Sequence, residues 1–279
     1  MKMLLQLSLL LNVLFILAGG LVCYKKRATI KTRISKYFAS SRVSEKDLKN
    51  FNIEPYEINN DTIQVSGGGR ALQVLFLGNS ITLTGVTAEE PDKTRRGCCS
   101  TSIEKDYVHI VLNRLAHDTA QNIDYSILNI AEFERSFSTT PFDFAQLEAC
   151  SVKNPDYLIV QIGENVAADD IANYGEKFEE QYIELLSHFP TAKRIICIPF
   201  WPDRRKAKYI TNVALKTKSH LVDLSHLGAS VVVKIGDYFD PLNLAESQKN
   251  YKQPGVGVHP GDYGMQSIAD AIYAAIGAE

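Results

Sequence analysis

Three short polar motifs contain residue types that together could carry out nucleophilic catalysis. Ser80 stands in FLGNSIT, at the end of one apolar run, and Asn165 stands in QIGENV, at the end of a later one. His259 stands in GVHPGDYGM, just ahead of the last helical pattern. A serine hydroxyl is a weak nucleophile until a base takes its proton, and the oxyanion that follows needs hydrogen-bond donors. The motifs therefore supply a candidate nucleophile, base and carboxamide donor.

Each of these residues also has a purely structural interpretation. Ser80 could cap a helix that begins after the apolar run, and Asn79 beside it suits a tight turn. Asn165 could likewise be a turn residue, and His259 a structural histidine. The catalytic interpretation is favoured because the three residue types that the chemistry needs occur in three separate loop motifs.

Short apolar runs alternate with segments of helical spacing from Ala71 onward. Near-continuous apolar strands separated by helices are typical of a parallel sheet that is covered on both faces. We therefore expect a three-layer α/β/α domain with a central, mostly parallel sheet. Ligands bind such sheets beyond the carboxyl ends of the strands, where Ser80 would lie. The apolar runs are LQVLFLG (72–78), YSILNIA (125–131), DYLIVQIG (156–163), RIICIPF (194–200) and HLVDL (220–224).

Helical spacing is found between and after these runs. The segments are YVHIVLNRLAHD, FAQLEACSV, YGEKFEEQYIELLSHF, DRRKAKYITNVALKTK and DYGMQSIADAIYAAIG. Upstream of Ala71, residues 25–69 are polar and charged and end in a glycine run, which predicts a spacer ahead of a domain at 70–279.

The N-terminus contains 22 uncharged residues, from Met3 to Tyr24. A helix rises ~1.5 Å per residue, so this segment would extend about 33 Å, enough to cross a membrane. Residues 1–24 are therefore expected to be a retained membrane anchor, with a cleaved signal peptide as the alternative. Basic residues after the apolar segment favour a cytoplasmic domain, whereas Lys2 and the terminal amine favour the opposite orientation, so the side of the membrane stays open.

Charge and cysteine content narrow the classes of partner. The 235 residues after residue 44 hold 22 basic and all 32 acidic residues, a net charge of −10. Such an acidic body argues against nucleic acid as a partner. The five cysteines do not form a disulfide framework, and Cys98 and Cys99 are adjacent without a second pair at ligand spacing. The sequence thus predicts no metal and no cofactor.

The same three motifs resemble those of the SGNH, or GDSL-like, hydrolase superfamily, over about residues 71–279. The resemblance implies a flavodoxin-like fold in which Ser80 is the nucleophile, His259 its base and Asn165 a donor of the oxyanion hole. Asn79, Glu164 and Arg135 are candidate substrate-binding residues, and Arg135 could instead pair with a nearby glutamate.

Two positions depart from the family pattern. Val256 stands where the family has the acid that orients the histidine, so a backbone carbonyl or another acid must replace it. The candidate acids are Asp262, Glu164, Glu132 and Glu134. In NIAEFERSF (129–137) the family's glycine is absent, so the N–H of Ala131 or Glu134 would donate to the oxyanion, and a side chain would narrow the site.

These features predict a membrane-anchored serine esterase that acts on a small-molecule or glycan ester, such as a carbohydrate O-acetyl group. Three alternatives stay open: an O-acyltransferase of the same chemistry, a lipid or lysophospholipid esterase, and an inactive membrane-tethered binding module.

Overall fold

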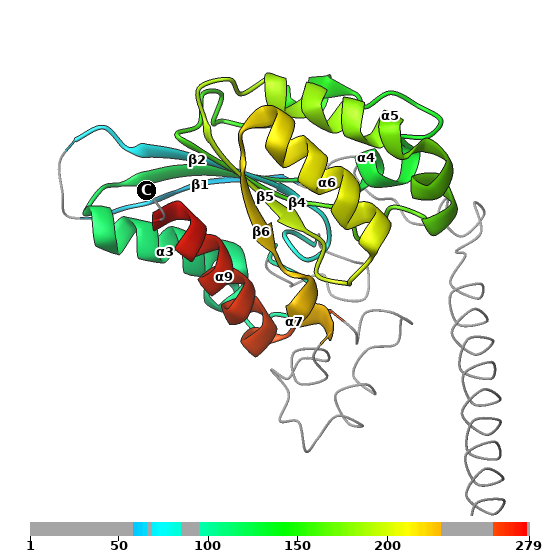
Figure 1. Ribbon diagram of the computed structural model, residues 1–279. Coiled ribbons are helices and arrows are strands. Elements are labelled where there is room, and N and C mark those ends of the chain that lie inside the picture. Colours follow the sequence, from blue (N-terminus) through cyan, green and yellow to red (C-terminus); the bar gives the residue numbers. More distant parts are fainter. Residues whose placement is uncertain (1–57, 66–68, 85–94, 230–258, 278–279) are drawn as a thin grey trace, which may run out of the picture. The chain divides into compact units, whose positions relative to one another are not determined.

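A six-stranded sheet forms the centre of the part of the chain that the structure describes (Figure 1). The structure is a computed structural model, and it describes residues 58–65, 69–84, 95–229 and 259–277. The strand order is β1-β3-β2-β4-β5-β6, with β1 antiparallel to β3 and all other pairs parallel. The predicted mostly parallel sheet is thus confirmed. The strands are β1 (Ile58–Ile63), β2 (Leu72–Gly78), β3 (Ile123–Asn129), β4 (Tyr157–Gln161), β5 (Lys193–Ile198) and β6 (His220–Asp223).

Helices cover both faces of this sheet, as the alternating pattern predicted. The helices α3 (Tyr107–Thr119) and α9 (Asp262–Gly277) pack on one face (Figure 1). The opposite face carries α4 (Ala131–Ser136), α5 (Ala168–Ser187) and α6 (Arg204–Thr217). Alternate strand residues enter the two resulting apolar layers, because successive side chains of a strand point to opposite faces. The short elements are η1 (Ile103–Lys105), η2 (Phe144–Ala149) and α7 (Ser225–Ala229).

Local signals account for where the helices begin and end. Asp106 caps α3 by accepting from the N–H of His109, and Asp203 caps α6 in the same way. Both helices end at a residue in the left-handed conformation, Ala120 and Lys218. The segment FAQLEACSV, expected to be helical, forms only the 3-10 helix η2.

The edge strand β1 lies inside the segment 25–69 that the sequence indicated as a spacer. It pairs with β3 along its whole length, from Ile58 opposite Leu128 to Ile63 opposite Ile123. Asn60 strengthens this edge, because its Oδ1 accepts from the Ser126 hydroxyl at 2.6 Å and its Nδ2 donates to a carbonyl of η2. The sheet therefore begins upstream of the boundary expected at residue 70.

The expected membrane segment at residues 1–24 lies outside the described residues, as does the chain up to residue 57. Among the described residues, no helix has both the length and the apolar character needed to cross a membrane.

Candidate active site

Ser80 and Asn165 follow neighbouring parallel strands at the carboxyl edge of the sheet. Ser80 comes after β2 and Asn165 after β4, and these two strands pair directly. The next strand in sequence after β2 is β3, which lies on the other side of β2. When the connections after two adjacent parallel strands run to opposite sides, they leave a crevice at the carboxyl ends of those strands. Ligands bind in this crevice in α/β folds of this kind. The two motifs therefore meet at the place that topology makes available to a substrate.

A tight turn, rather than a helix, presents Ser80. The carbonyl of Asn79 accepts from the N–H groups of Thr82 and Leu83, both at 2.9 Å, and the turn goes no further. The Asn79 Oδ1 accepts from the N–H of Ile81 at 3.1 Å, a side-chain turn that asparagine favours. The interpretation of Asn79 as a turn residue is confirmed, and the idea that Ser80 begins a helix is wrong.

The hydroxyl of Ser80 lies within hydrogen-bond reach of His259, although 179 residues separate the two in sequence. The Oγ–Nε2 distance is 2.9 Å, and both side chains are partly buried. This distance is suited to proton transfer from a hydroxyl to an imidazole. The ring of Trp201 packs edge-on against His259, with centroids 5.1 Å apart and planes at 89°. The Trp201 ring thus restricts rotation of the His259 imidazole.

The carboxamide of Asn165 is held by Glu134. Its Nδ2 donates to Glu134 Oε2 at 2.7 Å, and its backbone N–H donates to Oε1 at 3.2 Å. The N–H of Gly163 donates to the same Oε1. Glu134 is completely buried, and burial followed by the charge of Glu164 raises the pKa of Glu134 to about 7. Because an amide NH₂ has two hydrogens, this contact leaves the second one for another acceptor.

Asn79 and Glu164, two candidate substrate-binding residues, belong with Glu134 to a network of hydrogen bonds next to Ser80. We call this network the floor of the site. Asn79 is completely buried, and its Nδ2 donates to Glu164 at 2.7 Å and to Glu134 at 3.3 Å. Glu164 also accepts from Gln161 Nε2 at 2.5 Å and from the N–H of Phe200 at 2.8 Å. These contacts join the ends of β2, β4 and β5. The two side chains are thus engaged with the protein itself, because three loops need buried polar partners there.

A buried cation lies beside this floor. Lys206 of α6 donates to the backbone carbonyl of Glu164 at 3.3 Å. Burial lowers the pKa of Lys206, while the nearby charges of Glu164 and Asp203 act in the opposite direction. Lys206 thus places one positive charge near the carboxyl groups of Glu134 and Glu164.

Other candidates from the sequence lie away from the Ser80–His259 contact. The side chain of Arg135 is exposed on α4, and Glu132 is exposed on the same helix. The N–H of Ala131, an expected oxyanion donor, donates to Asn129 Oδ1 at 2.9 Å instead. The carboxylate of Asp262 accepts from Thr101 and Lys105. Val256 lies outside the described residues, so what orients His259 stays a prediction.

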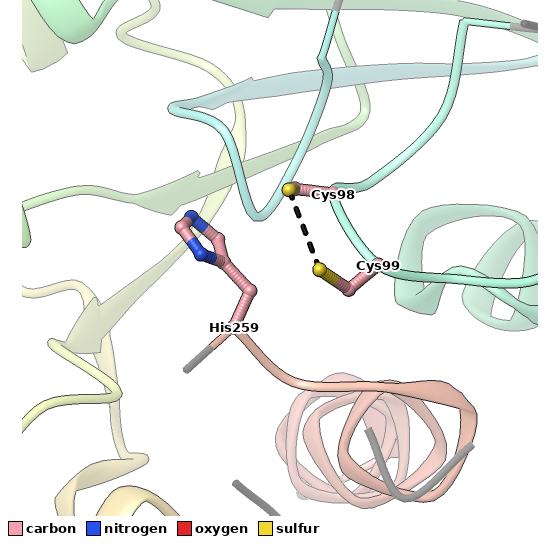
Figure 2. A group of neighbouring side chains, drawn as sticks. All are labelled: Cys98, Cys99 and His259. Carbon is pink, nitrogen blue, oxygen red and sulfur yellow. Dashed lines mark hydrogen bonds between the residues drawn. The ribbon is translucent and has the colours of Figure 1, made fainter. Parts of the chain in front are cut away.

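Two features of the site were not predicted from the sequence. The carboxylate of Glu134 was treated only as a possible partner of His259, yet it binds Asn165. Helical spacing gave a signal, since Glu134 lies one turn after the apolar Ala131 and both are buried. Cys98 and Cys99 approach His259, and no sequence signal links them to a residue 161 and 160 positions away (Figure 2).

Comparisons with known proteins give matches in structure alone. No family model matches the chain, and no curated protein does. The chain is similar to solved esterases. One is a two-domain esterase active on acetylated mannans, 16% identical, with a TM-score of 0.45; the match covers 74% of this chain and 49% of that one. A carbohydrate esterase family 2 enzyme from Myceliophthora fergusii is 17% identical, with a TM-score of 0.40 and coverage of 76% and 69%.

A third similar structure is a putative GDSL-like lipase from Bacteroides ovatus. It is 10% identical to this chain, with a TM-score of 0.43, and the match covers 75% of this chain and 99% of that one.

Proposed function

We propose that this protein is a serine esterase with Ser80 as its nucleophile. The observation that carries the proposal is the 2.9 Å contact between Ser80 Oγ and His259 Nε2 at the carboxyl edge of the sheet. In the proposed reaction His259 takes the serine proton while Oγ attacks the ester carbonyl. His259 then gives the proton to the departing alcohol, and water hydrolyses the acyl-enzyme by the same route.

The oxyanion is proposed to be held by Asn165 and by backbone N–H groups of the Ser80 turn. Glu134 supports this role, since it accepts one hydrogen of the Asn165 amide at 2.7 Å and fixes which end of the amide points outward. A donor fixed in advance stabilises the developing charge without reorganisation in the transition state. Asn79 and Glu164 are assigned a positioning role in place of contact with substrate, because Asn79 is buried and both side chains are hydrogen-bonded within the protein.

The finer proposal is a short acyl ester, such as an O-acetyl group on a carbohydrate, cleaved by a protein that residues 1–24 anchor to a membrane. It rests on the motif resemblance and on the apolar N-terminus. Release of acetate from an acetylated glycan, compared with release of long-chain acids from lysophospholipid, tests the substrate class. Product analysis with and without an acceptor glycan separates a hydrolase from a transferase.

The decisive experiment measures turnover of p-nitrophenyl acetate by the wild type, Ser80→Ala and His259→Ala. We expect both substitutions to lower kcat by ~10³-fold or more, because nucleophile and base act as one unit. Ser187→Ala, at the exposed end of α5, is the control and should keep full activity. A fluorophosphonate probe should label Ser80 in the wild type. Equal turnover in the wild type and Ser80→Ala would exclude the proposal.

A further inference from the structure

A pair of adjacent cysteines lies next to the proposed catalytic base. Cys98 and Cys99 are buried, with 5% and 3% of their surface exposed, and their sulfur atoms lie 3.6 Å apart. One nitrogen of His259 and both sulfurs all lie within 4.8 Å of one another. Figure 2 shows the two thiols near the imidazole, although the thiols come from the loop ahead of α3 and the imidazole from the segment just before α9.

The loop that carries the cysteines is fixed to the nucleophile turn. The N–H of Cys98 donates to the carbonyl of Ser80 at 2.8 Å, and Gly97 donates to the buried Asp106 at 3.2 Å. Gly97 approaches this turn so closely that an added Cβ would lie 2.4 Å from the carbonyl oxygen of Ile81. The position of the two thiols beside His259 is therefore built into the same packing that presents Ser80.

The spacing of the sulfurs fits a shared metal better than a disulfide. Two thiolates on a tetrahedral zinc ion, at ~2.3 Å each, lie about 3.8 Å apart. A disulfide needs ~2.05 Å between sulfurs, and consecutive Cα atoms, ~3.8 Å apart, are closer than disulfides usually allow. Thiolate and imidazole ligands are those that zinc and related soft cations prefer. The structure thus offers two sulfurs and one nitrogen as ligands.

We propose that Cys98, Cys99 and His259 form a binding site for a thiophilic cation, Zn²⁺ above all, and that its occupation switches off the base. Both thiols lose their protons on binding, so two protons are released for each ion. The site itself does not depend on the proposed esterase activity; only the inhibition does.

The inhibition follows whichever nitrogen of His259 binds the metal. A neutral imidazole has one nitrogen with a free lone pair, and the other carries the proton. If Nε2 binds the metal, its lone pair no longer faces Ser80. If Nδ1 binds the metal, Nε2 carries the hydrogen and cannot accept the serine proton. In both cases Ser80 loses its base.

The first test titrates Cd²⁺ into the reduced full-length chain and follows the thiolate-to-cadmium charge-transfer band. Cys23→Ser is the background, because that cysteine lies outside the described residues. We expect one ion per chain and loss of the band in Cys98→Ser/Cys99→Ser. Cys150→Ser, which also replaces a buried thiol, should bind as the background does. His259→Ala should weaken binding by about 10- to 100-fold. Equal binding in the background and the double variant would overturn the proposal.

A measurement on the unmutated site covers the case in which the double variant does not fold. X-ray absorption of the zinc-loaded chain should show two sulfurs at ~2.3 Å and a nitrogen at ~2.0 Å. A shell of nitrogen and oxygen alone would refute the site.

The second test adds Zn²⁺ during turnover of p-nitrophenyl acetate. One equivalent should lower activity by ~10-fold or more, a chelator should restore it, and acidification should weaken the inhibition because protons compete for the thiolates. Activity retained with the metal bound would overturn the switch. Cadmium binding in a chain without esterase activity would instead leave the site standing and reject the proposed function.

Discussion

At the scale of single residues, the carboxylate of Glu134 is the least expected part of the site. It has no access to solvent, yet it accepts from Asn165 and Gly163 and so determines how the Asn165 amide is turned. A carboxylate accepts at both oxygens, whereas glutamine would turn an NH₂ group toward one of its donors. Two accepting oxygens, and not only the shape of this side chain, are therefore needed.

We expect Glu134→Gln to lower kcat by about 10- to 100-fold with little change in KM. The reason is that the Asn165 amide must flip to avoid two facing donors, which withdraws its hydrogen from the oxyanion. Steady-state kinetics with p-nitrophenyl acetate measure this, and Glu132→Gln, an exposed acid on the same helix, is the matched control. A change confined to KM would argue against a role in the transition state.

Glu134 also predicts how stability depends on pH. Its pKa is raised from 4.5 to about 7 in the folded protein, so between these values the folded state holds a proton that the unfolded state has lost. Unfolding then releases a proton, and stability is lost as the pH rises through about 7. From this group we expect a decrease of about 3 kcal/mol between pH 4.5 and 8. Urea unfolding should show a flatter dependence in Glu134→Gln, and the same slope in both proteins would contradict the prediction.

At the scale of elements, the loop after β4 depends on a glycine in the left-handed half of backbone space. Gly163 has a φ of 120°, and a Cβ there would lie 2.5 Å from Pro199 Cγ after β5. This close approach allows the loops after two neighbouring strands to share the hydrogen bonds of Glu134 and Glu164.

We expect Gly163→Ala to lower the free energy of unfolding by about 2–4 kcal/mol, from backbone strain and the contact with Pro199 together. Gly69→Ala separates the two causes, because Gly69 has a φ of 139° but nothing within 4 Å of an added Cβ. Chemical denaturation of both variants checks this. Equal losses would show that the contact with Pro199 costs nothing.

At the scale of the whole molecule, the sheet of the described residues begins with β1, at Ile58. That strand covers the outer edge of β3, and an uncovered strand edge promotes aggregation. The segment expected to be a spacer thus contributes one strand to the sheet.

A chain that starts at residue 54 should therefore fold, whereas one that starts at residue 70 should be less stable and aggregate. Thermal unfolding and light scattering compare the two. Asn60→Ala, in the chain that is not shortened, removes hydrogen bonds to Ser126, Ala149 and Ser151. It should lower the free energy of unfolding by about 1–3 kcal/mol. Equal stability of the two shortened chains would contradict the role of β1.

The sequence by itself determined the α/β class, the positions of the strands from β2 onward and the residue types of the site. These follow from local periodicity, which packing on one face or two imposes on the chain. β1 was missed because INNDTI has few apolar residues, as suits an edge strand. The absence of a metal was predicted from spacing alone, which carries no information on His259 approaching Cys98.

Only the tertiary structure decided which side chains meet. Three contacts join residues far apart in sequence: Ser80 with His259, Glu134 with Asn165, and the two thiols with His259. Such contacts depend on how helices and loops pack at one edge of the sheet. Periodicity describes which face of an element is buried, but not which partner it finds there. The motif FLGNSIT could therefore indicate a candidate nucleophile. That His259, the Glu134 and Glu164 network and the two cysteines lie beside it could be learned only from the fold.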